Sequence, residues 1–152
     1  MITFNRNHVN ALAAIGWCEL YTGSIEQVIP VLEQVIRLSP RDPNIGNWYN
    51  RIGVVHLLQS RIDEAIVWSE KASSANPAHP LFHTQLASAY ALKGETDRAA
   101  VELAEARRLS SDDRFSSLAR LKAVAYFGVP KIRALFEANY FAGLRKAGMP
   151  EE

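Results

Sequence analysis

The chain has 152 residues, of which 48% are hydrophobic and 22% charged, and its formal net charge at pH 7 is +1. This length and composition are typical of one globular domain with a continuous core, so we expect a single domain over residues 1–152. So small a net charge gives no general attraction to nucleic acid or to anionic membranes, and neither is an expected partner.

Glycine and proline are sparse and fall at regular intervals, and no segment shows the alternation and turns that are typical of strands. Eight helices are therefore predicted, over about 7–21, 24–38, 43–59, 62–74, 80–93, 96–109, 112–127 and 130–146. Loops this short make successive helices antiparallel neighbours. The sequence predicts an all-α protein.

Polar residues ahead of apolar runs indicate where the helices begin. Ser24 has a capping-box spacing to a glutamine three residues on, and Asp42 precedes a proline that suits a first turn. Asp112 or Asp113 is expected to cap the seventh helix. Pro30 conflicts with this scheme because a proline inside the second helix removes a hydrogen bond. We expect either a kink there or a helix that begins later.

Small residues recur along the chain at a near-fixed step. Gly53 stands 34 residues before Ala87, Ala65 stands 34 before Ala99, and Gly16 precedes Gly53 by 37. A repeat of this length is one supersecondary unit, which must stack on its copies to bury its apolar face. The repeats cover about 9–42, 46–79 and 80–113, and the last two helices, within about 114–148, are expected to cap the end.

The repeated residues are Leu12, Ile15, Gly16, Gly23, Leu32 and Pro40 in the first copy; Tyr49, Ile52, Gly53, Ala65, Ala72 and Pro77 in the second; and Leu86, Ala87, Tyr90, Gly94, Ala99 and Ala106 in the third. In this pattern the chain resembles the tetratricopeptide repeat (TPR) family. It departs from the family at Val28 and Val35, where alanines are usual, and at Ser111, where proline is usual. The resemblance implies a right-handed α-α superhelix of three helical hairpins that acts as a protein-binding scaffold.

Two short segments carry a narrower resemblance. Residues 37–43, followed by Trp48, and residues 143–151 look like the C-terminal TPR region of bacterial class III adenylate/guanylate cyclases. That resemblance implies a regulatory or scaffolding part beside a cyclase domain, although nothing in this chain resembles the catalytic domain. A stand-alone relative is the alternative.

In TPR proteins the first helix of each hairpin lines the concave face, and the resemblance carries a set of side chains to that face. They are Asn10, Ala13, Trp17, Tyr21, Asn47, Asn50, Arg51, Val54, Leu58, Leu81, Thr84, Gln85 and Ser88. We expect a groove for a protein or peptide partner, with Trp17 and Tyr21 as aromatic anchors. The alternative is that Trp17, Val54 and Leu58 only pack against neighbouring helices. Only Arg51 is positively charged on the surface where other TPR domains hold a chaperone's C-terminal carboxylate, so an adaptor of that type is not expected.

The last helix carries more aromatic residues than a simple cap needs. Phe136, Tyr140 and Phe141 are expected to fold back onto the seventh helix, and a homodimer contact through them is the alternative.

No catalytic or metal-binding pattern stands out. His79 and His83 have helical spacing for one metal but no third ligand nearby, so a capping or solvated pair is expected instead. The chain has no glycine-rich phosphate loop, and its serines lack a nearby His/Asp context. We therefore expect neither an enzyme nor a cofactor.

Cys18 is the one cysteine, which excludes an internal disulfide, and its apolar helical setting predicts a small core residue in a reducing compartment. Residues 1–8 have no apolar secretory core, and no run of the sequence is apolar and long enough to span a bilayer. We expect a cytoplasmic protein.

Overall fold

A computed structural model of the chain describes residues 6–152, and these contain helices and loops but no strand. The helices are α1 (Arg6–Thr22), α2 (Val28–Leu38), α3 (Ile45–Leu58), α4 (Ile62–Ala75), α5 (Pro80–Lys93), α6 (Thr96–Leu109), α7 (Leu118–Val124), α8 (Pro130–Phe136) and α9 (Ala142–Lys146). A π-helical turn, Glu137–Phe141, joins α8 to α9 in one continuous helix. Residues 1–5, which hold most of the segment predicted to lack a secretory core, lie outside the described residues. None of the described helices is both long and apolar enough to cross a membrane.

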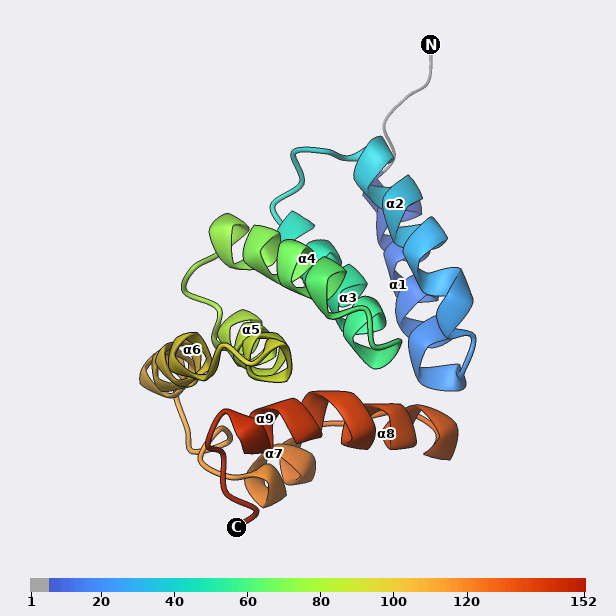
Figure 1. The fold of residues 1–152 in the computed structure, drawn as a ribbon. Helices are drawn as coiled ribbons and strands as arrows, with labels where there is room; N and C mark the ends of the chain where they lie inside the picture. Colours follow the sequence, from blue (N-terminus) through green and yellow to red (C-terminus); the bar gives the residue numbers. More distant parts are fainter. Residues whose placement is uncertain (1–5) are drawn as a thin grey trace.

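The first six helices form three antiparallel hairpins, α1 with α2, α3 with α4 and α5 with α6, that fan out side by side (Figure 1). Small residues lie at the contacts where the repeat predicts them. A Cβ atom on Gly16 would lie 3.3 Å from Leu32 Cδ2, and one on Gly53 would lie 2.9 Å from Ser69 Oγ. Ala65 is fully buried. The repeat in the sequence thus corresponds to a repeated close contact between helices in the structure.

The second helix begins later than the spacing of Ser24 predicts. A short 3₁₀ turn, Ile25–Gln27, precedes α2, and the Ser24 side chain makes no capping hydrogen bond. Pro30 is consequently the third residue of α2, where a backbone N–H has no partner inside the helix. The later start, rather than a kink, resolves the conflict.

The two predicted aspartate caps are wrong. Asp42 Oδ1 accepts a hydrogen bond from the Asn44 N–H at 2.8 Å inside the loop before α3, and the buried Asp42 carboxylate also pairs with Arg6. Asp112 bonds to the backbone and guanidinium of Arg114 in a loop, and Asp113, the alternative cap, pairs with Arg120 at 3.5 Å. Ser117 caps α7 instead, because its hydroxyl accepts from the Arg120 N–H at 3.2 Å. Asp42 and Asp112 stabilise loops that lead into helices rather than the helix ends.

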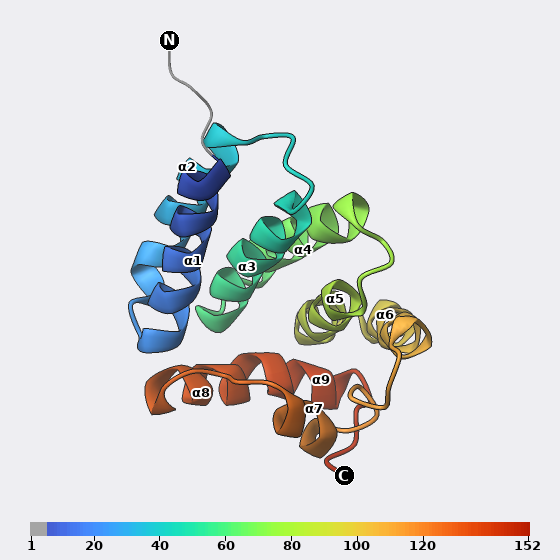
Figure 2. The same cartoon turned by 180° about the vertical axis from the view of Figure 1, so that it is seen from behind.

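The continuous C-terminal helix lies across the inner helices of the hairpins (Figures 1 and 2). Its α9 end packs on α5, its π-helical turn contacts α3 and α5, and α8 contacts α1. The Ser88 hydroxyl donates to the Tyr140 carbonyl at 2.8 Å, and Asn139 Nδ2 donates to the Leu58 carbonyl at 3.2 Å. The expected packing onto the segment 112–127 is present, through Phe127 and through Lys122, which pairs with Glu137, but the helix also covers part of the concave side.

The dimer contact suggested for the C-terminal aromatic residues is not supported by their burial. Phe136, Tyr140 and Phe141 are 4%, 4% and 3% exposed within one chain. Phe127 packs edge-on against Phe136 and Phe141, with ring centroids 5.1 Å and 4.9 Å away. Since these rings already fill the core between the C-terminal helix and the hairpins, they offer no surface to a second copy.

Candidate functional site

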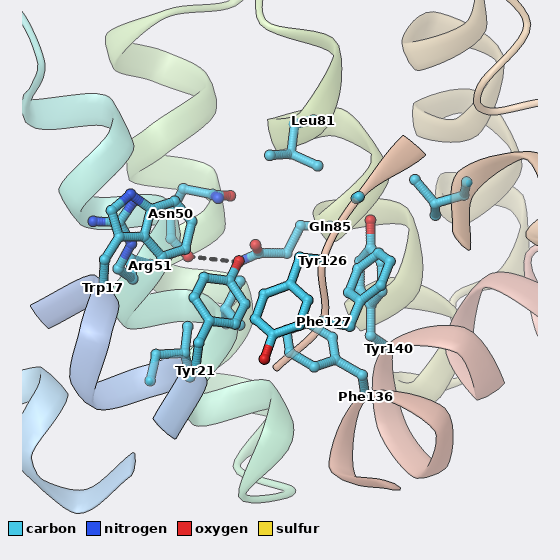
Figure 3. Close-up of a pocket in the computed structure, with 14 residues that line it drawn as sticks. Trp17, Tyr21, Asn50, Arg51, Leu81, Gln85, Tyr126, Phe127, Phe136 and Tyr140 are labelled. Atoms are coloured by element: carbon cyan, nitrogen blue, oxygen red, sulfur yellow. Dashed lines mark hydrogen bonds between the residues drawn. The ribbon is translucent and has the colours of Figure 1, made fainter. Parts of the chain in front are cut away.

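An apolar cavity of about 120 Å³ lies between the inner helices and the C-terminal segment (Figure 3). Its walls are Trp17, Leu20, Tyr21, Asn50, Arg51, Val54, Leu81, Gln85, Leu121, Ala125, Tyr126, Phe127, Phe136 and Tyr140. A shallower outer hollow adjoins it between α1 and α3 and is lined by Asn10, Ala13, Ala14, Trp17, Asn44, Asn47, Trp48 and Arg51. Trp17 and Arg51 line both spaces.

The structure gathers most of the groove residues predicted from the sequence around these two spaces. Trp17, Tyr21, Asn50, Arg51, Val54, Leu81 and Gln85 line the cavity, and Asn10, Ala13 and Asn47 line the outer hollow. Leu58, Thr84 and Ser88 line neither space, because all three are packed inside the fold. Thr84 bonds to the Pro80 carbonyl of its own helix.

The opposite wall of the cavity comes from the C-terminal segment, which sequence reasoning did not place there. Leu121, Ala125, Tyr126 and Phe127 precede α8, and Phe136 and Tyr140 follow on the C-terminal helix. The density of aromatic residues in this part of the sequence was a usable signal, but it suggested packing onto the seventh helix, with a dimer contact as the alternative. Covering the concave side turns an open groove into a partly enclosed cavity.

A row of stacked planar groups forms the rim of the cavity. The Arg51 Cζ atom lies 3.1 Å from the centroid of the Trp17 ring, which stacks on Tyr21 at 4.9 Å. Tyr21 in turn contacts Tyr126 with ring centroids 5.5 Å apart. Trp17 is still 42% exposed, so a large aromatic surface remains accessible where the two spaces meet.

Arg51 is a buried cation in these surroundings. Only 8% of the residue is exposed, and burial lowers the pKa of Arg51 to about 10. The guanidinium is still protonated at neutral pH. Burial likewise raises the pKa of Tyr21, against the opposing effect of Arg51, so the phenol stays neutral.

Three buried polar atoms on the cavity walls have no hydrogen-bond partner among the described residues: Asn50 Oδ1, Arg51 Nε and Tyr140 Oη. Figure 3 shows Asn50 and Arg51 beside Trp17, with Tyr140 on the far side beside Phe136. Gln85 differs from them, because its Nε2 atom donates to the Asn50 carbonyl at 3.0 Å and to Ser69 Oγ at 2.9 Å. Gln85 therefore fixes α5 to α3 and α4, while the three unpartnered atoms are left for other interactions.

The two histidines of the 79–83 pair have separate roles: His79 occupies the N-cap position of α5, and His83 is buried rather than solvated. His79 stacks on Phe82 with centroids 4.1 Å apart and makes no side-chain cap. His83 is buried between Glu102 Oε2 and the Pro77 carbonyl, each 2.6 Å from a ring nitrogen. Within residues 6–152, no three His, Cys, Asp or Glu side chains group closely enough to hold a metal ion.

The His83–Glu102 pair predicts a pH dependence of stability. Burial opposes the charged form, but both ring nitrogens face acceptors, and the bonds to Glu102 and Pro77 raise the pKa of His83 overall. Glu105 also favours the charged ring. The other titratable group nearby is His79, whose own pKa is lowered by burial and by the charge on His83. The charged His83 ring therefore contributes its full stabilisation at a pH below the unfolded-state pKa of about 6.5. This contribution is lost as pH rises through the folded-state pKa.

Urea unfolding of the wild type and of His83→Gln across this pH range checks the prediction. The difference in unfolding free energy between the two is expected to be largest at low pH and to shrink as pH rises. His56→Gln is the control, because the pKa of His56 is lowered by burial and its difference should change in the opposite sense. A constant difference for His83→Gln would contradict a charged ring.

Comparisons with known proteins agree on the fold. No protein-family model matches the sequence, and no match is found among curated proteins. Solved structures do match. The Yersinia enterocolitica type III secretion chaperone SycD, in complex with a peptide of the translocator YopD, has 17% identity and a TM-score of 0.67, covering 90% of this chain and 95% of that one. PcrH from Pseudomonas aeruginosa has 16% identity and a TM-score of 0.66, covering 95% of each chain.

A third match is part of a larger enzyme. A mutant of the Thermobaculum terrenum O-GlcNAc transferase has 19% identity and a TM-score of 0.69, covering 93% of this chain but 27% of that one. None of these matches supports the cyclase resemblance. At such low identities the similarity shows the fold alone: the chain is an all-α, TPR-like solenoid of three helical hairpins with a C-terminal capping pair, as the repeat in its sequence predicts.

Proposed function

We propose that the chain is a protein-interaction module that binds a short peptide or helix against its inner helices and catalyses no reaction of its own. The observation that carries this proposal is that the outer hollow and the apolar cavity share one wall, the Trp17 ring, which is still 42% exposed. A large aromatic surface at the mouth of an apolar cavity is typical of a binding hot spot.

The two spaces suggest how a ligand would lie. The outer hollow is open and offers exposed amide side chains, Asn10 and Asn47, that can bond to a peptide backbone. The cavity has room for about one side chain. Because the C-terminal helix covers α5, the ligand would be short and would insert one apolar side chain past Trp17. The similar structure that holds a peptide, SycD with its YopD segment, supports a peptide as the kind of partner.

Selection from a displayed library of short random peptides tests the proposal. Peptides that bind are expected to quench or shift the fluorescence of Trp17, and Trp17→Ala should weaken them about 30-fold, which is typical of a hot-spot residue. Val101→Ala is the matched control, since Val101 is 67% exposed on the outer helix α6. Combined alanine substitution of Trp17, Asn50 and Val54 should abolish binding while the circular dichroism remains helical. If no peptide is selected, or if the triple variant binds equally well, the proposal fails.

The cyclase resemblance remains a second candidate, as a regulatory part of an adenylate/guanylate cyclase. The segments that carry it also have packing roles: Ser39 bonds to Asp42 at 3.1 Å, and Leu118 donates to the Pro150 carbonyl at 2.9 Å. Their resemblance can therefore reflect the fold rather than a shared activity. The chain alone is expected to produce no cyclic nucleotide in a cyclase assay.

A further inference from the structure

Arg51 carries a positive charge that nothing in its surroundings balances. None of the residues that line the cavity or the outer hollow is an aspartate or glutamate. Among the described residues no carboxylate forms an ion pair with Arg51, whose closest interaction is with the Trp17 ring. A cation-π contact recovers only part of the cost of removing a guanidinium from water. Buried charges in native proteins are normally paired, so this arrangement favours an anion from outside the chain.

The unpartnered atoms beside Arg51 indicate what else that anion must carry. Asn50 Oδ1 needs a donor, and Arg51 Nε needs an acceptor; both are buried on the same side of the cavity (Figure 3). A peptide supplies both kinds of group, a carboxylate for the guanidinium and a backbone N–H for the amide oxygen. A purely apolar ligand would leave both atoms unsatisfied, at a cost for each.

The rest of the cavity determines the size of the apolar group. Beyond Arg51 and Asn50 the walls are formed mainly by aliphatic and aromatic side chains such as Val54, Leu81 and Phe136. The volume, about 120 Å³, is close to the ~150 Å³ of an engineered cavity that takes up benzene. One aromatic or branched aliphatic side chain is enough to fill it.

We propose that the cavity binds a peptide in which an apolar anchor residue lies next to a carboxylate, and that this carboxylate pairs with Arg51. The inference rests on the proposed function and specifies its partner. The carboxylate comes either from an aspartate or glutamate beside the anchor or from the free C-terminus of the peptide. Both sources offer the same two oxygens to the guanidinium.

Matched peptides test the chemistry of the ligand on the wild-type protein. Each peptide ends in Phe, preceded by Glu or by Gln, and has either a free or an amidated C-terminus. We expect at least one carboxylate form to bind about 30-fold more tightly than the peptide that has neither, as expected for a close, desolvated charge pair. The pair of peptides that shows this difference identifies which of the two carboxylates is read.

Variants of Arg51 test the other side of the pair. Arg51→Met replaces an unpaired buried charge by an apolar group, so the free protein should unfold at the same or a higher temperature. The same variant should bind the Glu and Gln peptides equally. Arg51→Gln is a second neutral variant in case methionine alters the packing. Arg108→Gln is the control for charge alone, because Arg108 is exposed on α6, and it should keep the preference.

The outcomes separate this inference from the proposed function. Binding of neutral and carboxylate peptides with equal affinity would overturn the role of Arg51 and leave peptide binding intact. A preference for carboxylate that persists in both neutral Arg51 variants would also overturn it. No binding of any peptide would remove both proposals. Binding of 3-phenylpropionate, used as a small-molecule probe, without binding of any peptide would assign the cavity to a small carboxylate instead.

Discussion

Gly143→Ala is expected to lower the unfolding free energy by about 3 kcal/mol or more and to release the C-terminal helix from α5. A Cβ atom at Gly143 would lie 2.6 Å from the Ser88 carbonyl oxygen and still closer to the Ser88 hydroxyl. Folded proteins do not tolerate such contacts, so the two helices must separate. Chemical denaturation measures the loss, and hydrogen exchange of residues 137–147 shows whether this segment loses its protection.

Two further variants isolate the steric cause. Gly94→Ala introduces a methyl group where the φ angle is +94° but no atom lies within 4 Å, so only backbone strain of about 1 kcal/mol is expected. Ser88→Gly combined with Gly143→Ala removes the hydroxyl but not the backbone carbonyl, so it should recover only part of the loss. If Gly143→Ala is no more harmful than Gly94→Ala, the close approach of the two helices is wrong.

Phe136→Ala should destabilise a single chain by about 3–5 kcal/mol, the range for removing a large aromatic residue from a core. Phe136 is 4% exposed and packs edge-on against Phe127 and Tyr140. Urea unfolding at several protein concentrations measures the effect, which should be independent of concentration because the contacts lie within one chain.

The same experiment decides between a core residue and a dimer contact. Tyr126→Ala removes an aromatic ring from the same wall of the cavity, but Tyr126 is 64% exposed and its loss should cost far less. If Phe136→Ala instead left stability unchanged and shifted the sedimentation profile from dimer to monomer, the burial of Phe136 in one chain would be contradicted.

The three hairpins could be predicted from the sequence because their contacts depend on residue size alone. Gly53 and Ala65 are small where two backbones approach, and no other property of the sequence is needed to locate such positions. Most of the residues predicted for the concave face lie together around the cavity and the outer hollow, because residues such as Trp17 and Val54 follow the inner face of regular helices. The helix boundaries were harder to predict, because side chains such as Ser24 and Asp42 can form hydrogen bonds either at a helix end or within a loop.

The position of the C-terminal helix could not be predicted from the sequence. Its apolar stripe showed that one face is buried, but the partner surface depends on the close approach of Gly143 to Ser88, two residues far apart in the chain. Neither residue is distinctive in the sequence. The cavity was missed because half of its wall depends on this packing.

Cys18 shows a related limit, since it is exposed rather than buried as expected. An apolar helix in the middle of a stack is covered by helices on both sides. Among the described helices α1 is the first of the stack and has a neighbouring hairpin on one side only, so Cys18 and Ile15 remain accessible. Helical periodicity alone does not distinguish an inner repeat from a terminal one.

The cavity walls belong to two parts of the chain, the hairpins and the C-terminal segment that crosses them. A ligand that touches both walls binds more tightly when the C-terminal segment is packed on the hairpins. By linkage, the bound ligand stabilises that packing by the same factor. Occupancy should therefore slow local opening of residues 121–147 and raise the melting temperature with the logarithm of the ligand concentration relative to Kd. Ligand binding at the rim beside Trp17 would therefore reduce local opening at the far end of the last helix, with no rearrangement of the repeats.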